Sequence, residues 1–211
     1  MKHNKTPSNK VIRRQEKIKN VALELFLTKG YQETNLSDII KLSGGSYSSI
    51  YENFKSKEGL FFEILDDVCK KHFALLSSKI QQIHNGSLEE ILYSFGITYM
   101  EIFNELQVVL FRKIIYSQVY NKEKYLRKWM ENNQENFAYD ILIEYFNRQN
   151  NASIIANSNK LAKLFCAMLT EPYHTLNVLA DTPLMDKNEQ KAHVDFVDFI
   201  VSIFINGIPK G

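Results

Sequence analysis

Glycine and proline are scarce in this chain, and this scarcity constrains the fold more than any other feature of the sequence. Only 8 glycines and 4 prolines occur among 211 residues, and several of them separate segments of helical periodicity. Apolar residues recur three and four positions apart, as on one face of an α-helix. No segment shows the alternating, β-branched pattern that is typical of a strand. The sequence therefore predicts an all-α protein.

The same periodicity sets the expected helices. The first begins at about Arg14 and stops at Gly30, and a short one covers residues 36–43 and ends at Gly44. Asn35, with Asp38 three positions later, is expected to open the short helix. A long helix should begin at Ser56. Further helices are expected at about 88–104, 106–119, 122–149, 157–181 and 188–206.

The bulk composition favours a globular protein of the cell interior. Hydrophobic residues make up 45% of the chain and charged residues 24%, which is ordinary for a soluble domain. The apolar run that begins at Phe196 contains Asp198 and is too short to span a bilayer, and no signal-peptide pattern follows Met1. Cys69 and Cys166 lie far apart in apolar sequence, which predicts buried thiols and neither a disulfide nor a metal site.

The small net charge of +2 hides an uneven distribution. Residues 1–60 contain 11 Lys and Arg against 6 Asp and Glu, whereas residues 61–211 contain 15 against 18. Seven of the basic residues lie within the first 19 positions. A solvated tail, disordered over residues 1–10, and a basic arm that neutralises phosphates both fit this pattern, and charge alone does not decide between them.

Residues 43–54, "SGGSYSSIYENF", are poor helix formers between two well-defined helices. Two short helices around a glycine turn describe a helix-turn-helix unit, whose second helix enters the major groove of DNA. Small and hydroxyl-bearing side chains can lie close to base edges there. Ile50 and Phe54 are expected to point back into the domain. The candidate DNA contacts are Asn35, Tyr47, Ser48, Ser49, Tyr51, Lys55 and Lys57.

The segment "ALELFLTKGYQETNLSDIIKLSGGSYSSIYENFKSKEGL" resembles the DNA-binding region of the TetR family of transcriptional repressors. The resemblance continues through "FFEILDD", "ENNQ" and "EPYH". It implies a homodimer that binds double-stranded operator DNA, with a DNA-binding domain at residues 1–57 and a ligand-binding and dimerisation domain at 58–211. It also implies that Tyr51 and Lys57 contact the phosphate backbone, and that the protein represses a multidrug efflux operon.

The recognition segment departs from the family pattern at three positions. Gly45 stands where the family often has valine, Tyr47 where it commonly has a basic residue, and Ser48 where it often has glycine. A core contact is lost at Gly45, and the helix is weakened. We therefore predict that residues 45–53 are poorly ordered without DNA and become helical on the operator.

The carboxy-terminal helices are expected to form the dimer interface. "NKLAKLFCAMLTEPYHTLNVL" is apolar nearly all round, and "HVDFVDFIVSIFI" leaves only a narrow polar line at Asp195, Asp198 and Ser202. Helices with so little polar surface must be covered on more than one side. Two helices from each protomer would form a four-helix bundle. An ordinary monomeric core is the alternative.

A few polar residues interrupt the apolar stripes and suggest a large, mostly apolar ligand cavity. Pro172 should kink the helix near Glu171 and His174, because it frees a backbone carbonyl. The implied ligands are bulky amphipathic molecules, such as drugs, dyes or bile-salt-like compounds, with the sign of their charge left open. The candidate ligand-binding residues are His72, Phe103, Phe111, Phe137, Tyr139, Cys166, Glu171 and His174.

Two other functions compete with a ligand-responsive repressor. An enzyme would need a nucleophile signature, a phosphate-binding loop or zinc-type spacing, and the sequence shows none of these. We therefore predict no catalytic residues, no cofactor, no metal and no membrane partner. A helical DNA-binding protein with a structural role and no inducer stays open as the alternative.

Overall fold

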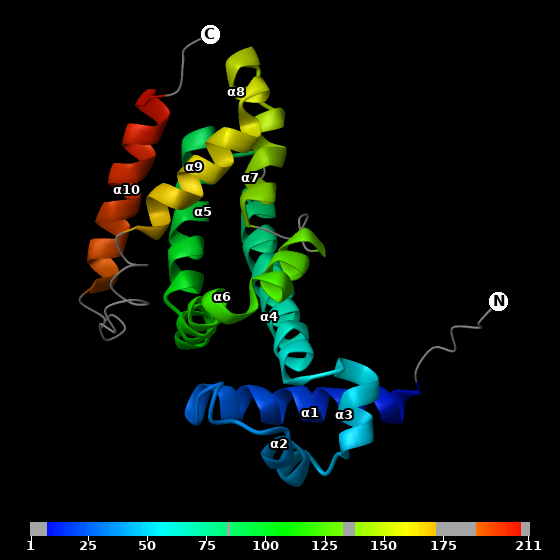
Figure 1. The fold of residues 1–211 in the computed structure, drawn as a ribbon. Coiled ribbons are helices and arrows are strands. Elements are labelled where there is room, and N and C mark those ends of the chain that lie inside the picture. Colours follow the sequence, from blue (N-terminus) through cyan, green and yellow to red (C-terminus); the bar gives the residue numbers. More distant parts are fainter. Residues whose placement is uncertain (1–7, 84, 133–137, 172–188, 208–211) are drawn as a thin grey trace, which may run out of the picture. The chain divides into compact units, whose positions relative to one another are not determined.

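A computed structural model gives the fold of the chain and describes residues 8–83, 85–132, 138–171 and 189–207 (Figure 1). The described residues form ten α-helices and no strand, which confirms the all-α prediction. None of these helices is both long enough and apolar enough to cross a membrane. The chain divides into two compact units, Met1–Val68 and Cys69–Gly211.

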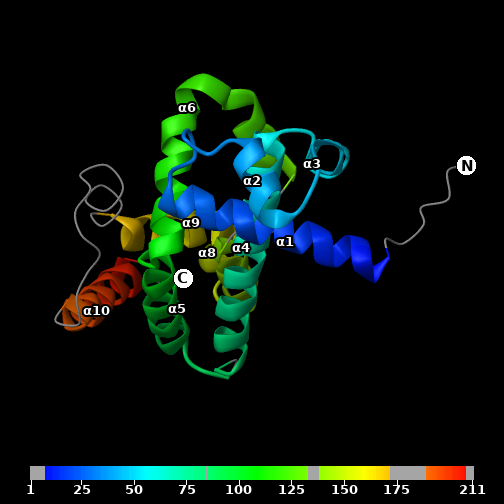
Figure 2. The same cartoon turned by 90° about the horizontal axis from the view of Figure 1, so that it is seen from below.

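The amino-terminal unit consists of three helices and the beginning of a fourth. These are α1 (Asn9–Thr28), α2 (Leu36–Ser43), α3 (Tyr47–Phe54) and α4 (Lys57–Gln81). Figures 1 and 2 show α2 and α3 lying next to each other beside α1. The buried core includes Ile18, Ala22, Ile39 and Ile50.

Three aromatic rings close this core. The ring of Phe26 lies 5.1 Å from that of Tyr31 and 6.0 Å from that of Phe61, and the rings of Tyr31 and Phe61 are 5.3 Å apart. Tilted and edge-on aromatic contacts of this kind stabilise a core beyond the area that they bury. The first turns of α4 therefore pack into the helix-turn-helix unit through Phe61.

The first helix begins about five residues earlier than the periodicity indicated. Ser8 is its N-cap, and Val11 and Ile12 on its first turns are exposed. Because these turns bury no apolar face, hydrophobic spacing could not reveal them. Lysine, arginine, glutamine and glutamate are good helix formers, and they extend the helix into solvent. Much of the basic amino-terminal segment is therefore helical, from Asn9 on.

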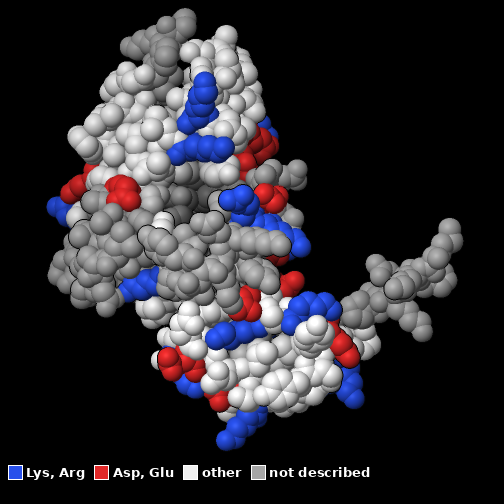
Figure 3. Space-filling view, in the orientation of Figure 1, with Lys and Arg blue, Asp and Glu red and all other residues white. Residues whose placement is uncertain are grey.

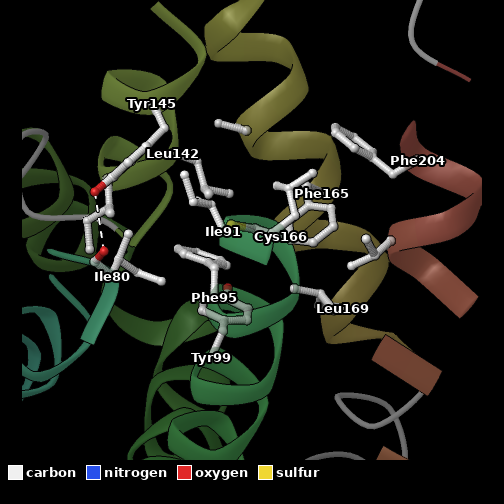
Figure 4. Packing of buried hydrophobic residues seen from close by; sticks show 14 of the residues in the cluster. Ile80, Ile91, Phe95, Tyr99, Leu142, Tyr145, Phe165, Cys166, Leu169 and Phe204 are labelled. Atoms are coloured by element: carbon white, nitrogen blue, oxygen red, sulfur yellow. Dashed lines mark hydrogen bonds between the residues drawn. The ribbon is translucent and has the colours of Figure 1, made fainter. Parts of the chain in front are cut away.

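The second unit is built around α5 (Leu88–Phe103), which packs against α9 (Ser158–Thr170) and α10 (Glu189–Gly207). A capping box of Ser87 and Glu90 opens α5. α9 also packs against α7 (Ala138–Asn147). Aromatic residues from these helices fill the core, including Phe95, Tyr145, Phe146, Phe165 and Phe204 (Figure 4).

Gly96 lets α10 approach α5 closely. A Cβ atom at this position would lie 2.7 Å from Cγ1 of Val197, which is closer than carbon atoms approach each other. Glycine inside a helix costs about 1 kcal/mol relative to alanine. The close contact of the two helices explains why the chain carries it in the middle of α5.

Three further expectations about the helices were wrong. α6 (Leu106–Asn132) continues through Tyr120 and Asn121, where a break was predicted, because no glycine or proline interrupts it. The short helix α8 (Ala152–Ala156) was not predicted, and Asn151 caps it by accepting hydrogen bonds from two backbone amides. α9 ends at Thr170 where a kinked helix to about 181 was expected. Glu171 adopts an extended backbone, as is usual for a residue before proline.

Candidate DNA-binding and effector sites

Residues 43–46 form a tight turn that sets the direction of α3. Gly44 has a left-handed backbone (φ 72°), and its amide donates to the carbonyl of Ile40. Such a glycine ends helices because it has no Cβ to clash. Ser46 then caps α3, since its hydroxyl accepts a hydrogen bond from the amide of Ser49 at 3.2 Å. The weak helix formers of this segment are thus a C-cap glycine and an N-cap serine.

Gly45 confirms the lost core contact. A Cβ atom there would lie 3.5 Å from Cδ1 of Ile18, so a valine would have packed on α1. α3 is nevertheless helical from Tyr47 to Phe54. The expectation that residues 45–53 gain order on the operator stays a prediction, to be measured by amide exchange.

One face of α3 packs on the domain and the opposite face is open. Ile50 and Phe54 are buried, as predicted. Tyr47 is 61% exposed and Tyr51 68% exposed, and Ser48 beside them is exposed as well. Two large aromatic rings on an exposed helix face are unusual unless the face binds a partner. Tyr47, Ser48 and Tyr51 therefore share one accessible surface.

The remaining candidates on and near α3 are less accessible or lie elsewhere. Ser49 is half-buried, and its backbone carbonyl accepts a hydrogen bond from the side-chain Nδ2 of Asn53. Asn53 in turn accepts one from Gln15 at 2.6 Å. Asn35 is exposed at the start of α2. It is the N-cap of that helix, but its side chain caps no amide among the described residues.

Asp38, expected to open α2 together with Asn35, accepts a hydrogen bond from the backbone of Asn35 and also pairs with Lys29. Its carboxylate accepts a hydrogen bond from the Lys29 ammonium at 2.6 Å. This bond is the main reason why the pKa of Asp38 lies below its ordinary value. The pair joins the end of α1 to α2.

The two lysines after α3 differ in environment. Lys55 is exposed, has a positive φ of 67°, and donates to the carbonyl of Glu52 at 3.0 Å. Lys57 is half-buried, and its ammonium donates to the carbonyls of Tyr31 at 2.9 Å and Thr34 at 3.0 Å. The same nitrogen lies 3.4 Å from the carbonyl of Gln32 and 4.5 Å from the centre of the Tyr31 ring. In this structure Lys57 holds the α1–α2 connection, and its phosphate contact stays a prediction.

On the face shown in Figure 3, basic and acidic side chains are interspersed over the amino-terminal unit. The basic excess of residues 1–60 therefore does not appear as one continuous patch there. A surface of mixed charge still carries individual cations that can meet phosphates. Because each phosphate contact adds to the salt dependence of binding, their number can be measured.

In the second unit, a small polar group lies at the edge of the aromatic core. The Tyr99 ring is buried and lies 4.3 Å from that of Phe103. Burial raises the pKa of the Tyr99 hydroxyl, which interacts with the side chains of Thr170 and Cys166. Burial also raises the pKa of Cys166 to about 12. Two members of the candidate ligand set, Phe103 and Cys166, therefore both lie at Tyr99. Figure 4 shows Tyr99 and Cys166 in this region of the core.

The other ligand candidates have different immediate neighbours. His72 is buried on α4, with its Nε2 3.1 Å from Oε2 of Glu105. Phe111 is buried on α6, and Tyr139 on α7 lies under the ammonium of Lys163 at 5.2 Å from the ring centre. Glu171 is exposed at the end of α9. Phe137 and His174 lie outside the described residues.

Sequence reasoning missed Arg112, which belongs to the group around Tyr99. Its guanidinium carbon lies 4.9 Å from the centre of the Phe103 ring. Its Nη2 atom is buried. The signal was available, because Arg112 is a charged residue inside the apolar-rich run "VVLFRKII". Periodicity alone could not show which way its side chain turns.

The fold and the open face of α3 define a helix-turn-helix protein with a second, helical unit. Residues 18–64 match the model of bacterial regulatory proteins of the tetR family. The HTH-type transcriptional regulator QacR of Staphylococcus aureus is 49% identical over 51 residues, which are 24% of this chain and 27% of QacR. The chain spans less than a third of the length of the curated relatives that it matches.

Solved structures extend the similarity of fold to nearly the whole chain. A crystal structure assigned to the TetR family, from Mesorhizobium loti MAFF303099, superposes with a TM-score of 0.76 at 18% identity and covers 94% of this chain and 98% of its own. The Flavonoid-responsive Regulator FrrA gives a TM-score of 0.68 at 21% identity, covering 94% and 99%. The family match thus covers residues 18–64, and the solved structures extend the similarity of fold to the second unit.

Proposed function

We propose that this chain is a ligand-responsive transcriptional repressor of a multidrug efflux operon, which binds operator DNA as a homodimer and is released by bulky amphipathic effectors. The observation that carries the proposal is the open face of α3, where Tyr47, Ser48 and Tyr51 lie on a helix held by its opposite face. We further propose that its place within the family is near the efflux repressor CmeR. Residues 1–57 would bind DNA, and residues 58–211 would bind the effector and the second protomer.

In this proposal α3 lies in the major groove. Ser48 is short enough to bring the helix backbone close to the bases, and hydroxyl groups donate to or accept from either strand. Tyr51 and Lys55 would contact phosphates beside the groove, because both are exposed at the end of α3. A dimer would place two copies of α3 about 34–36 Å apart, one helical turn of DNA.

The homodimer is supported by apolar residues that the second unit leaves exposed. α9 and α10 bury one face in their own core, yet Leu164 is 53% exposed, Phe199 60% and Ile203 47%. α9 and α10 are neighbours in the fold. Asp195, Asp198 and Ser202 form an exposed polar line along α10, as predicted, and Phe199 lies beside this line. A second copy would cover the apolar residues.

Substitution of Phe199 by glutamate tests the dimer. Phe199→Glu should convert the protein to a monomer in sedimentation experiments, because a charge would be buried without a partner. Ile155→Glu is the matched control, since Ile155 is an exposed apolar residue of α8, outside the expected interface. A Phe199→Glu protein that sediments as the wild type does would contradict this interface.

Effector release would act through α4, which runs without a break from Lys57 to Gln81. We propose that an effector in the second unit displaces α4 and changes the separation of the two copies of α3. A coupling free energy of about 1–3 kcal/mol would change operator affinity about 5- to 150-fold. FrrA, a protein of similar fold, is named a flavonoid-responsive regulator, and flavonoids are organic molecules.

The test is a DNA titration with and without effector. Duplexes from the DNA upstream of the protein's own gene and of neighbouring genes would be titrated, with cholate and a cationic triarylmethane dye as probes. The proposal predicts binding by two chains per site and a weaker affinity with at least one probe. If no amphiphile changes the affinity for the operator, and none raises the melting temperature of the protein, the result would favour a structural DNA-binding protein.

A further inference from the structure

Arg112 is half-buried, and its guanidinium has no complete set of hydrogen-bond acceptors among the described residues. Among the described residues no group accepts a hydrogen bond from its Nη2 atom, which is shielded from solvent. A guanidinium carries five N–H donors in a fixed planar arrangement and keeps its charge. A buried donor without an acceptor costs free energy, and a charged one costs more. Such a group calls for an acceptor that the described chain does not supply.

The surroundings of Arg112 combine an apolar wall with a few polar groups. The face of Phe103 lies 4.9 Å from the guanidinium carbon, and Tyr99 packs against Phe103. Burial lowers the pKa of Arg112, while Tyr116, Tyr99 and Glu171 act in the opposite direction. Glu171 is the acidic residue of this group, and it is exposed. Glu171 favours the charged form of Arg112, but Nη2 has no acceptor among the described residues.

We propose that Arg112 anchors the carboxylate of an amphipathic organic anion, whose apolar body packs against Phe103 and Tyr99. This inference rests on the proposed effector function and decides the sign of charge that the sequence left open. A planar guanidinium and a carboxylate form two parallel, charge-assisted hydrogen bonds. Rings beside the anchor provide contact area for an aromatic or steroid body.

An acceptor supplied by the chain itself would instead make Arg112 a structural residue. The two roles predict opposite effects of Arg112→Met in the absence of ligand. If Arg112 is a ligand anchor, methionine removes a charged group with an unsatisfied buried donor. The melting temperature of the ligand-free protein should then rise by a few degrees. If Arg112 is structurally paired, the same substitution leaves a buried acceptor unsatisfied and lowers the melting temperature.

The binding test uses acids and their neutral amides. Cholate is compared with cholamide, and 1-naphthaleneacetate with 1-naphthaleneacetamide, by calorimetric titration of the full-length protein. Each pair shares one apolar body and differs only in the charged group. We expect at least one acid to bind about 10- to 100-fold more tightly than its amide, as one charge-assisted pair provides.

Arg112→Met should abolish this preference for the acid, and Arg148→Gln should keep it. Arg148 is the matched control, because it is exposed and pairs with Glu144 on the surface of α7. Equal affinities of acid and amide in both pairs, or no binding of either acid, would overturn the proposal. So would a preference that survives in Arg112→Met.

Titration of upstream duplexes with ligand-free Arg112→Met separates this inference from the proposed function. Arg112→Met should bind DNA as the wild type does. If neither protein binds any duplex, the repressor function fails, while the comparison of acid and amide still decides the role of Arg112. If both bind DNA and no acid is preferred, only the anchor is refuted.

Discussion

Replacement of Lys57 by methionine removes the group that holds the α1–α2 connection in place. Its ammonium makes two good hydrogen bonds, to the carbonyls of Tyr31 at 2.9 Å and Thr34 at 3.0 Å. The contact with Gln32 is long, at 3.4 Å. Methionine fills a similar volume but donates no hydrogen bond, so the carbonyls lose their charged donor.

The size of the effect follows from these contacts. A hydrogen bond to a charged group contributes about 1.5–3 kcal/mol, and a cation above a tyrosine ring adds about 0.5–1 kcal/mol. Because Lys57 is half-buried and water can replace part of these bonds, we expect a net loss of about 2 kcal/mol. A loss of 2 kcal/mol corresponds to about 30-fold faster exchange of the amides that open with the domain.

Hydrogen exchange of the α2 amides, Leu36–Ser43, measures this loss in the DNA-free protein. Lys55→Met is the control, because the ammonium of Lys55 is exposed and donates only to the carbonyl of Glu52 among the bonds described. The control should exchange as the wild type does. If Lys55 contacts a phosphate, the slope of log K for operator binding against log salt concentration should become shallower by about 0.9 in Lys55→Met. Unchanged exchange in Lys57→Met, with a reduced salt slope, would refute the scaffold role and favour the phosphate contact.

Three further predictions concern the amino-terminal unit. Ser46→Ala removes the N-cap of α3 and should cost about 1 kcal/mol, so the α3 amides of the operator-bound protein should exchange about 5-fold faster, whereas Ser46→Asn should be nearly neutral. In the wild type, amides of residues 45–53 should exchange rapidly without DNA and slowly on the operator, and equal protection in both states would contradict the ordering. The lowered pKa of Asp38 means that its pairing with Lys29 stabilises the fold above the ordinary value of 3.8 and is lost as the pH falls through the folded-state pKa. Urea unfolding should therefore depend less on acid pH in Asp38→Asn than in the wild type.

Much of the fold could be predicted from apolar spacing and glycine positions. Gly30 and Gly44 end α1 and α2, and the Ser87 capping box starts α5, because these signals act within one turn of the chain. The continuity of α6 and the start of α1 could not be predicted. α6 contains no glycine or proline that would show where it ends. The exposed first turns of α1, from Asn9, carry no apolar stripe.

The site was predictable where it depends on local pattern and not where it depends on packing. Ile50 and Phe54 fix the orientation of α3, so the open face of Tyr47 and Tyr51 followed from spacing. The inward turn of Lys57 depends on a connection 23 to 26 residues away in sequence. The position of the Arg112 guanidinium over the Phe103 ring likewise depends on how α5 packs on α6.

Two copies of α3 should read one duplex, and footprinting can show both contacts on the DNA. The DNA upstream of the protein's own and neighbouring genes would be probed at moderate salt with the wild type and with Ser48→Glu, which places an anion on the open face of α3. The account predicts protection of two half-sites centred one helical turn apart by the wild type and none by the variant. A monomeric protein that protects no duplex, or protection that Ser48→Glu leaves intact, would contradict it.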